Sequence, residues 1–239
     1  MEIHFKILRY DPAVDHPPYF QDYVVAAKPE ERLLDCLNRV QGEQDATLAY
    51  RKSCGHGVCG SDAMKINGKC RLACQELVKN YVNNEVVVEP LPGYRVQKDL
   101  MVDLEPFFEK VNLVRPYLIA PEASLSEERR QAPEDRKKVD HVIRCILCAC
   151  CTASCPVVLE NEAFLGPAPL VWAFRRVFDT RDENRVERLR SLDSPEGAWG
   201  CENRFECTRM CPKEIPVTKS INQLKREIQQ VLSPPEGSS

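Results

Sequence analysis

Short runs of alternating hydrophobic and polar residues fill the first hundred positions of the chain. Alternation of this kind predicts half-buried strands, which here lie at residues 3–7, 23–27, 63–66 and 85–91. Residues 31–40 instead carry leucine and valine at helical spacing, which predicts one short helix packed on the sheet. Asn67 and Gly68 follow the third strand and form a strong hairpin signal. This part of the chain is therefore predicted to combine a sheet with a helix.

Helical periodicity replaces alternation after about residue 105. The predicted helices lie at residues 133–143, 168–178, 183–192 and 217–232. We therefore expect an α+β protein with two domains, the first over residues 1–105 and an all-α second domain over residues 106–239. Residues 181–190 mix both signs of charge, a pattern that predicts a solvated helix face and not a nucleic-acid contact.

Composition and charge narrow the classes of function. Of the 239 residues, 43% are hydrophobic and 29% are charged, as in a soluble globular protein. A net charge of -3 and a pI near 5.9 give no electrostatic basis for binding nucleic acid or anionic lipid. Apolar runs fall far short of the ~20 residues that span a bilayer, so any link to a membrane is expected to come through partner chains.

Cysteine is the unusual part of the composition, with 13 residues. An odd number rules out complete disulfide pairing within the chain. The first residues resemble neither a signal peptide nor a transit segment, which predicts a reducing, cytosolic compartment. Clustered cysteines in such a compartment bind metal more often than they form disulfides.

The first candidate metal site lies in the predicted α+β domain. Cys54 and Cys59 are separated by four residues, as in the first half of the plant-type C-x4-C-x2-C…C spacing for a two-iron cluster. The third ligand position holds Asp62, and Cys74 can supply the remote fourth ligand. Either Asp62 binds iron through a carboxylate oxygen, or Cys70 supplies the fourth thiolate. We favour Asp62 because the loop already presents that position to the cluster.

Two further cysteine runs follow in the predicted helical domain. The first matches the bacterial ferredoxin motif C-x2-C-x2-C-x3-C-P, with Cys145, Cys148, Cys151, Cys155 and Pro156. The second run is altered: Arg204 stands at one of its four places, and the other three hold Cys201, Cys207 and Cys211. In two-cluster ferredoxins the fourth cysteine of each run ligates the other cluster, and this rule assigns the ligands here.

One cluster thereby receives four thiolates and the other receives three. The complete set, which predicts a 4Fe-4S cluster, is Cys145, Cys148, Cys151 and Cys211. The incomplete set is Cys155, Cys201 and Cys207. Arg204 cannot replace the missing ligand, since a guanidinium has no lone pair to offer a metal. A cubane that lacks one protein ligand readily loses that corner iron, so a 3Fe-4S cluster is expected.

The remaining cysteines and the competing metal sites are weaker candidates. Cys36 falls on the predicted amphipathic helix and is expected to behave as a small core hydrophobe, and Cys150 is out of register with the motif. Zinc favours C-x2-C pairs spaced for tetrahedral sites, which the three-cysteine runs and C-P endings do not fit. A Rieske-type site needs two histidines on one iron, so His56 is interpreted as a solvent-facing loop residue.

These three sites, in this order, resemble those of the iron–sulfur subunit of succinate:quinone oxidoreductase, respiratory complex II. The resemblance covers nearly the whole chain and includes SCGHGVCGSDAMKINGK, EPLPGYRVQKDLMVD, CILCACCTASCP, FLGPAPL and CTRMCPKEIP. It implies a β-grasp plant-type ferredoxin domain followed by a helical bacterial-ferredoxin-like domain. It also implies a flavoprotein partner with covalent FAD that oxidises succinate to fumarate. Membrane anchor subunits, in some members with haem b, would pass the electrons to quinone.

Position by position, the resemblance implies a 2Fe-2S cluster nearest the flavin, a 4Fe-4S cluster in the middle and a 3Fe-4S cluster next to quinone. Some family members, succinate dehydrogenases among them, have aspartate where this chain has Asp62. The implied location is peripheral, on the cytoplasmic face of a prokaryotic inner membrane, held by the anchor subunits.

The quinone end departs from the family pattern. Ubiquinone-using relatives have a tryptophan and a histidine where this chain has Glu160 and Glu202, while Pro156 matches. Arg204 stands where relatives have a small or apolar residue, and Glu202 and Arg204 are expected to pair with each other or with an anchor subunit. These departures indicate either a different quinone, such as menaquinone, or a rearranged quinone pocket, and the sequence leaves both hypotheses open.

Two rival functions remain open. The iron–sulfur subunit of fumarate reductase uses the same series of clusters to carry electrons in the opposite direction, but those reductases commonly keep cysteine at the position of Asp62. A free electron-carrier ferredoxin is the rival function of another class. The GPAPLVWAF segment and the large helical surface instead favour a subunit that docks onto partner chains. The one G-x-G-x-x-G, at residues 55–60, lies inside the cysteine loop and opens no predicted helix, so FAD is expected on another polypeptide.

Overall fold

The computed structural model describes residues 1–14, 17–81, 85–120 and 128–232. Its internal contacts divide the chain into two compact units. The first comprises Met1–Leu104 together with Ile146–Ser154, and the second comprises Glu105–Cys145 and Cys155–Ser239. A short piece of the first ferredoxin-type run therefore belongs to the unit that the N-terminal residues form.

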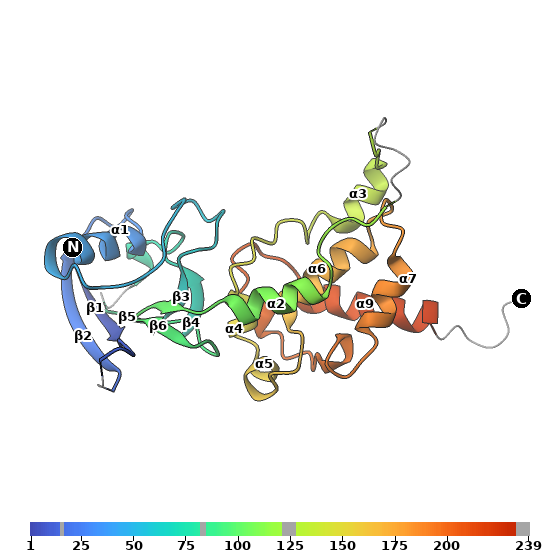
Figure 1. The fold of residues 1–239 in the computed structure, drawn as a ribbon. Coiled ribbons are helices and arrows are strands. Elements are labelled where there is room, and N and C mark those ends of the chain that lie inside the picture. Colours follow the sequence, from blue (N-terminus) through green and yellow to red (C-terminus); the bar gives the residue numbers. More distant parts are fainter. Residues whose placement is uncertain (15–16, 82–84, 121–127, 233–239) are drawn as a thin grey trace, which may run out of the picture. The chain divides into compact units, whose positions relative to one another are not determined.

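A mixed sheet forms the first unit, with the strand order β2-β1-β5-β3-β4 (Figure 1). Its strands are β1 (Glu2–Arg9), β2 (Tyr19–Ala26), β3 (Ala63–Ile66), β4 (Lys69–Leu72) and β5 (Glu85–Glu89). β1 pairs antiparallel with β2 and parallel with β5, and α1 (Leu33–Arg39) lies in the connection between them. A separate ribbon pairs β6 (Val96–Lys98) with β7 (Met101–Val102). This is β-grasp topology, as expected.

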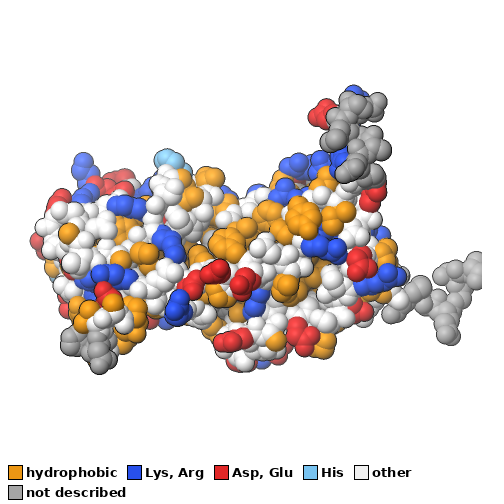
Figure 2. Space-filling view, viewed as in Figure 1, with side chains coloured by type: hydrophobic (Ala, Val, Ile, Leu, Met, Phe, Trp, Pro, Cys, Tyr) orange, Lys and Arg blue, Asp and Glu red, His pale blue; other side chains and the backbone are white. Residues whose placement is uncertain are grey.

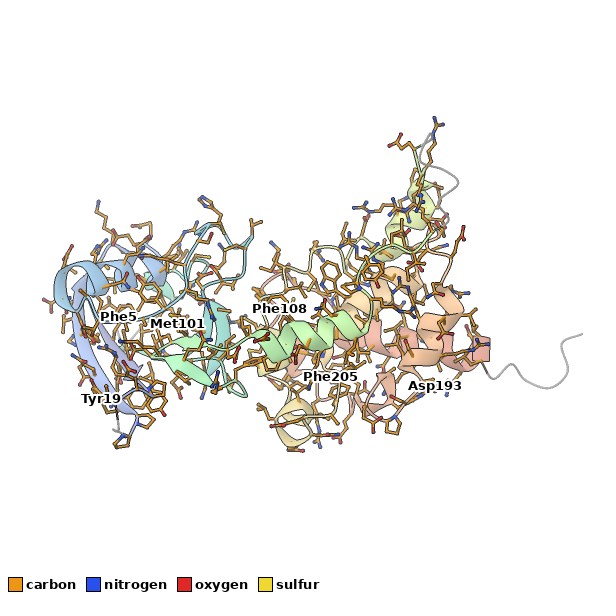
Figure 3. The ribbon with its side chains drawn as sticks, in the orientation of Figure 1. Phe5, Tyr19, Met101, Phe108, Asp193 and Phe205 are labelled. Carbon is orange, nitrogen blue, oxygen red and sulfur yellow. The ribbon has the colours of Figure 1, made fainter. Side chains whose placement is uncertain are left out.

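The alternation along β1 produces the buried face of the sheet. Ile3, Phe5 and Ile7 are buried, and full burial of each such side chain contributes roughly 1.5–3 kcal/mol. Phe5 lies inside the unit, whereas Tyr19 stands at its rim and is 54% exposed (Figure 3). Cys36 on α1 has no exposed surface, which confirms that it is part of the core.

The β3–β4 hairpin positions two candidate ligands. Asn67 and Gly68 have φ of 44° and 78°, the pair of positive values that a type I′ turn requires. Asp62 precedes β3 and Cys74 follows β4, so the two residues emerge at the same end of the hairpin. The amide of Ala73 donates to the carbonyl oxygen of Asp62 at 3.1 Å. The predicted hairpin is confirmed.

Helices form the second unit. The longer ones are α2 (Glu105–Leu113), α6 (Pro167–Val177), α7 (Arg185–Leu192) and α9 (Val217–Leu232), and the shorter ones are α3 (Pro133–Val139), α5 (Pro156–Glu160) and α8 (Glu206–Arg209). α6, α7 and α9 pack on one another, and α2 packs on α6. Periodicity predicted α3, α6, α7 and α9. It missed α2, which buries only Phe107 and Val111 and so has a weak apolar stripe.

The mixed-charge segment around α7 has the solvated face that its sequence predicted, with Arg185, Glu187 and Arg190 exposed, but two of its charged residues are buried. Arg188 is 2% exposed and Asp182 is 7% exposed. Nε and Nη2 of Arg188 donate to the two carboxylate oxygens of Asp182 at 3.0 and 2.8 Å. The guanidinium also donates to the carbonyl oxygens of Val114, Arg115 and Tyr117. The prediction was wrong at this pair because a charge pattern does not reveal partners from other parts of the chain.

The surface of the protein carries charges of both signs. Acidic and basic side chains are interspersed on the face shown in Figure 2. In the part of the chain that the structure describes, every helix is too short or too polar to cross a bilayer.

Candidate metal centres

The loop after Cys54 turns its backbone amides toward the thiols. Three glycines in it have φ between 66° and 72°, namely Gly55, Gly57 and Gly60, and only glycine adopts such values cheaply. The amides of His56 and Cys59 each donate to Sγ of Cys54 at 3.3 Å. The hydrogen bond from the His56 amide first, then that with the Cys59 side chain and those from the amides of Val58 and Cys59, lower the pKa of Cys54 to about 6. The loop therefore favours the thiolate, the form that binds metal.

Asp62 presents a buried, unsatisfied oxygen to the same loop. The residue is 2% exposed, and its Oδ2 accepts a hydrogen bond from the amide of Cys74 at 2.6 Å. Its Oδ1 is buried and has no hydrogen-bond partner among the described residues. Burying a carboxylate oxygen without a partner is costly, and a metal ion would satisfy it. Burial, followed by the contact with Asp62, raises the pKa of the Cys74 thiol to about 11.

Cys70, the alternative ligand, is a buried residue of the hairpin. It is 3% exposed on β4. Burial raises the pKa of its thiol. The buried Oδ1 of Asp62, which has no hydrogen-bond partner among the described residues, favours Asp62 over Cys70 as the ligand. His56 is exposed, as expected of a loop histidine.

The two later cysteine runs share one backbone conformation. Leu147 and Ala149 have φ of 53° and 64°, and Asn203 and Phe205 have 60° and 64° at the corresponding places. Each pair precedes a single helical turn, α4 (Cys150–Ala153) or α8. This common register places Arg204 where the first run has its second cysteine. The structure therefore supports the interpretation of the second run as a ferredoxin-type run with one ligand missing.

Three thiols line one pocket in the second unit. They belong to Cys155, Cys201 and Cys207, whose side chains line the pocket together with Thr218. Sγ of Cys207 lies 3.4 Å from Oγ1 of Thr218. Burial raises the pKa of Cys155 and of Cys207.

The rim of this pocket carries most of the residues expected near quinone. Pro156, Glu202 and Arg204 line it together with Phe205, whereas Glu160 lies exposed at the end of α5 and is not among the lining residues. Nε and Nη2 of Arg204 donate to Oε2 of Glu202 at 3.0 and 2.8 Å. Both side chains are more than half exposed, so this ion pair contributes little stability.

The four cysteines predicted to bind the middle cluster are divided between the units. Cys148 and Cys151 belong to the first unit, and Cys145 and Cys211 belong to the second. Within the first unit, a Cβ at Gly60 would lie 2.8 Å from the Cβ of Cys148, so glycine is required there for close approach as well as for φ. The grouping of the four thiolates around one cluster remains a prediction from the motif.

The candidate ligands are not arranged for a mononuclear metal site. Within the described ranges, no three His, Cys, Asp or Glu side chains are placed to hold one metal ion. A cluster distributes its protein ligands over several iron atoms, whereas zinc needs thiolates at ~2.3 Å from one centre.

The fold and the thiol-bearing loops together define an iron–sulfur protein with a plant-type and a bacterial-type ferredoxin region. Residues 4–109 match the model of a 2Fe-2S iron-sulfur cluster binding domain, and residues 141–215 match that of a 4Fe-4S dicluster domain. Relatives described as succinate dehydrogenase iron-sulfur subunits are 39–40% identical to this chain over 92–97% of its length, so the chain belongs to that family. The expected fold class and family are thereby confirmed.

Relatives cover almost the whole chain. The succinate dehydrogenase iron-sulfur subunit of Coxiella burnetii is 40% identical over 229 residues, which is 95% of this chain and 97% of the relative. A mitochondrial subunit of Arabidopsis thaliana, succinate dehydrogenase [ubiquinone] iron-sulfur subunit 3, is 39% identical over 97% of this chain and 76% of its own length. A chain of the Mycobacterium smegmatis Sdh1 complex in the apo form superposes with a TM-score of 0.89 at 27% identity, over 99% of both chains.

Proposed function

We propose that this chain is the electron-transfer subunit of a succinate dehydrogenase, a succinate:quinone oxidoreductase. It passes electrons from FAD on a flavoprotein partner through 2Fe-2S, 4Fe-4S and 3Fe-4S clusters to a membrane quinone. The observation that carries the proposal is that one chain holds two incomplete thiolate sets of different kinds. The buried, unpartnered Oδ1 of Asp62 would complete one set, and Arg204 stands at the missing place of the other, beside the pocket that its three thiols line.

The ligands of the three clusters follow from this proposal. They are Cys54, Cys59, Asp62 and Cys74 for 2Fe-2S; Cys145, Cys148, Cys151 and Cys211 for 4Fe-4S; and Cys155, Cys201 and Cys207 for 3Fe-4S. When bound, the clusters supply one-electron redox chemistry. The chain's own contribution is to hold the thiolates, aim backbone amides at their sulfur atoms and bury them, and these factors set the reduction potentials.

Membership in a succinate dehydrogenase complex implies a flavoprotein partner and a membrane anchor. We place the chain as a peripheral component at the cytoplasmic face of a prokaryotic inner membrane, held by anchor subunits that contain haem b in some relatives. The pocket rim with Pro156, Glu202 and Arg204 would then be the quinone-proximal end, with Glu160 beside it. The two ferredoxin domains are assigned to residues 1–105 and 106–239.

Purification of the native complex with electron paramagnetic resonance tests the proposal. We expect the chain to co-purify with a flavoprotein, and to give two-iron and four-iron signals on reduction and a three-iron signal in the oxidised state. A chain that isolates alone with all its clusters would contradict the subunit assignment. Two four-iron clusters without a three-iron signal would contradict the interpretation of Arg204.

Replacing Asp62 by alanine is expected to alter or abolish the two-iron signal and to leave the other two signals unchanged. The physical reason is the loss of the buried Oδ1 that would bind iron. Cys70→Ala is the matched control, because Cys70 is also buried and lies on β4 of the same hairpin. If Cys70→Ala removes the two-iron signal and Asp62→Ala does not, the ligand is Cys70.

A further inference from the structure

A guanidinium outside the ligand motif joins the two halves of the two-iron site. Arg32 precedes α1, and nothing in the sequence pattern singled it out. Its Nη1 donates to the carbonyl oxygen of Cys74, and to that of Gly55 at 3.4 Å. Gly55 belongs to the loop that follows Cys54, and Cys74 is the remote ligand. One side chain therefore ties the loop to the segment that follows the hairpin.

A side-chain amide reaches the same carbonyl oxygen from the other side. Nε2 of Gln75 donates to the carbonyl oxygen of Cys74 at 3.2 Å and lies 3.9 Å from Sγ of Cys74. A Cβ added at Gly57 would lie 2.7 Å from Cδ of Gln75, so the Gln75 side chain rests directly on the loop backbone. The loop is thus held at Gly55 by Arg32 and covered at Gly57 by Gln75.

The charge of Arg32 is not neutralised by a salt bridge. Among the residues that the structure describes, no carboxylate lies within ion-pair distance of its guanidinium. The nearby Asp35 carboxylate accepts a hydrogen bond from the backbone amide of Arg32 at 3.0 Å instead. A positive charge beside a redox centre favours the more negative, reduced form. Net charge and hydrogen bonds to the sulfur atoms also set the potentials of iron–sulfur clusters.

We propose that Arg32 and Gln75 are positioning residues of the two-iron site, and that Arg32 raises its reduction potential. This inference rests on the ligand assignment in the proposed function. Arg32 holds the ligand loop against Cys74 through two carbonyl oxygens. Gln75 holds the remote ligand and directs its amide toward the sulfur. Both act through the residues that bind the cluster and not on the substrate of the complex.

The test is a redox titration of the two-iron paramagnetic signal in the intact complex. Arg32→Met is expected to weaken electron binding about tenfold, which is ~59 mV for a one-electron couple. Arg32→Lys keeps the charge but cannot reproduce the planar fork of the guanidinium. The reduction potential of the two-iron cluster should therefore shift by less than half as much as in Arg32→Met, while the line shape of its signal changes. Gln75→Leu is expected to lower the potential by a smaller amount.

Arg39→Met is the matched control. Arg39 lies on the same helix and loses the same charge, but its guanidinium binds Glu31 and the carbonyl oxygen of Ala26. An unchanged potential and line shape in Arg32→Met, or an equal shift in Arg39→Met, would overturn the inference and leave the ligand assignment intact. If the Arg32→Met complex does not assemble, two other results together overturn the inference. They are a wild-type line shape in Arg32→Lys and an unchanged reduction potential in Gln75→Leu. A complex without any two-iron signal before mutation would instead contradict the proposed function.

Discussion

Replacing Arg204 by cysteine is expected to convert the three-iron cluster into a four-iron cluster. Arg204 stands where the first run has its second cysteine, because positive-φ residues flank both places in the same way. A thiolate at this position would complete the ligand set of the three-thiol pocket. The three-iron signal of the oxidised complex should disappear, and the iron content should rise by about one atom per chain.

Arg204→Ala is the control for this conversion. It removes the exposed ion pair with Glu202 but adds no ligand, so the three-iron signal and the iron content should be retained. A cysteine variant that keeps the three-iron signal, measured in the same complex with intact two-iron and four-iron signals, would show that position 204 does not face the missing corner.

Replacing Arg188 by methionine is expected to lower the free energy of unfolding by about 3–5 kcal/mol. The change leaves the buried Asp182 carboxylate without its bidentate partner, and it removes the donor to three main-chain carbonyl oxygens. For a chain of this size the midpoint of thermal unfolding should fall by roughly 6–20 °C. Circular dichroism at increasing temperature measures this shift.

Arg190→Met provides the matched comparison on the same helix. Its side chain is 66% exposed and lies 3.7 Å from Glu187, so its effect should stay within about 0.5 kcal/mol. Adding Asp182→Asn to Arg188→Met should recover part of the lost stability, because it removes the uncompensated buried charge. Equal shifts for the two arginine variants would show that the Arg188 network contributes nothing special to stability.

Local patterns in the sequence were sufficient to predict the features that depend only on residues close together along the chain. The Asn67-Gly68 turn depends on backbone conformations that these two residues adopt readily. Buried alternation in β1 and the apolar stripe of α9 depend on the periods of strand and helix. Cysteine spacing is equally local, because a cluster bound by a short loop constrains the number of residues between its ligands. The candidate ligands could therefore be proposed from spacing alone.

Contacts between distant parts of the chain were decided only by the tertiary structure. The sequence offered Asp62 and Cys70 as alternative ligands, and only the folded hairpin shows that Oδ1 of Asp62 is buried without a hydrogen-bond partner among the described residues. Spacing likewise did not mark Arg32 as a bridge between Gly55 and Cys74.

The same limit explains the errors. The charges around α7 suggested a solvated face, yet Arg188 is buried because it binds the carboxylate of Asp182 in the same segment and three carbonyl oxygens from elsewhere in the fold. Ile146–Ser154 belongs to the first unit, although Glu105–Cys145 of the second unit separates it in sequence from the rest of the first. Spacing along the chain determined which residues can bind iron. Burial and partners through space, which no local pattern encodes, determined which oxygen is free to bind it and which charges support the fold.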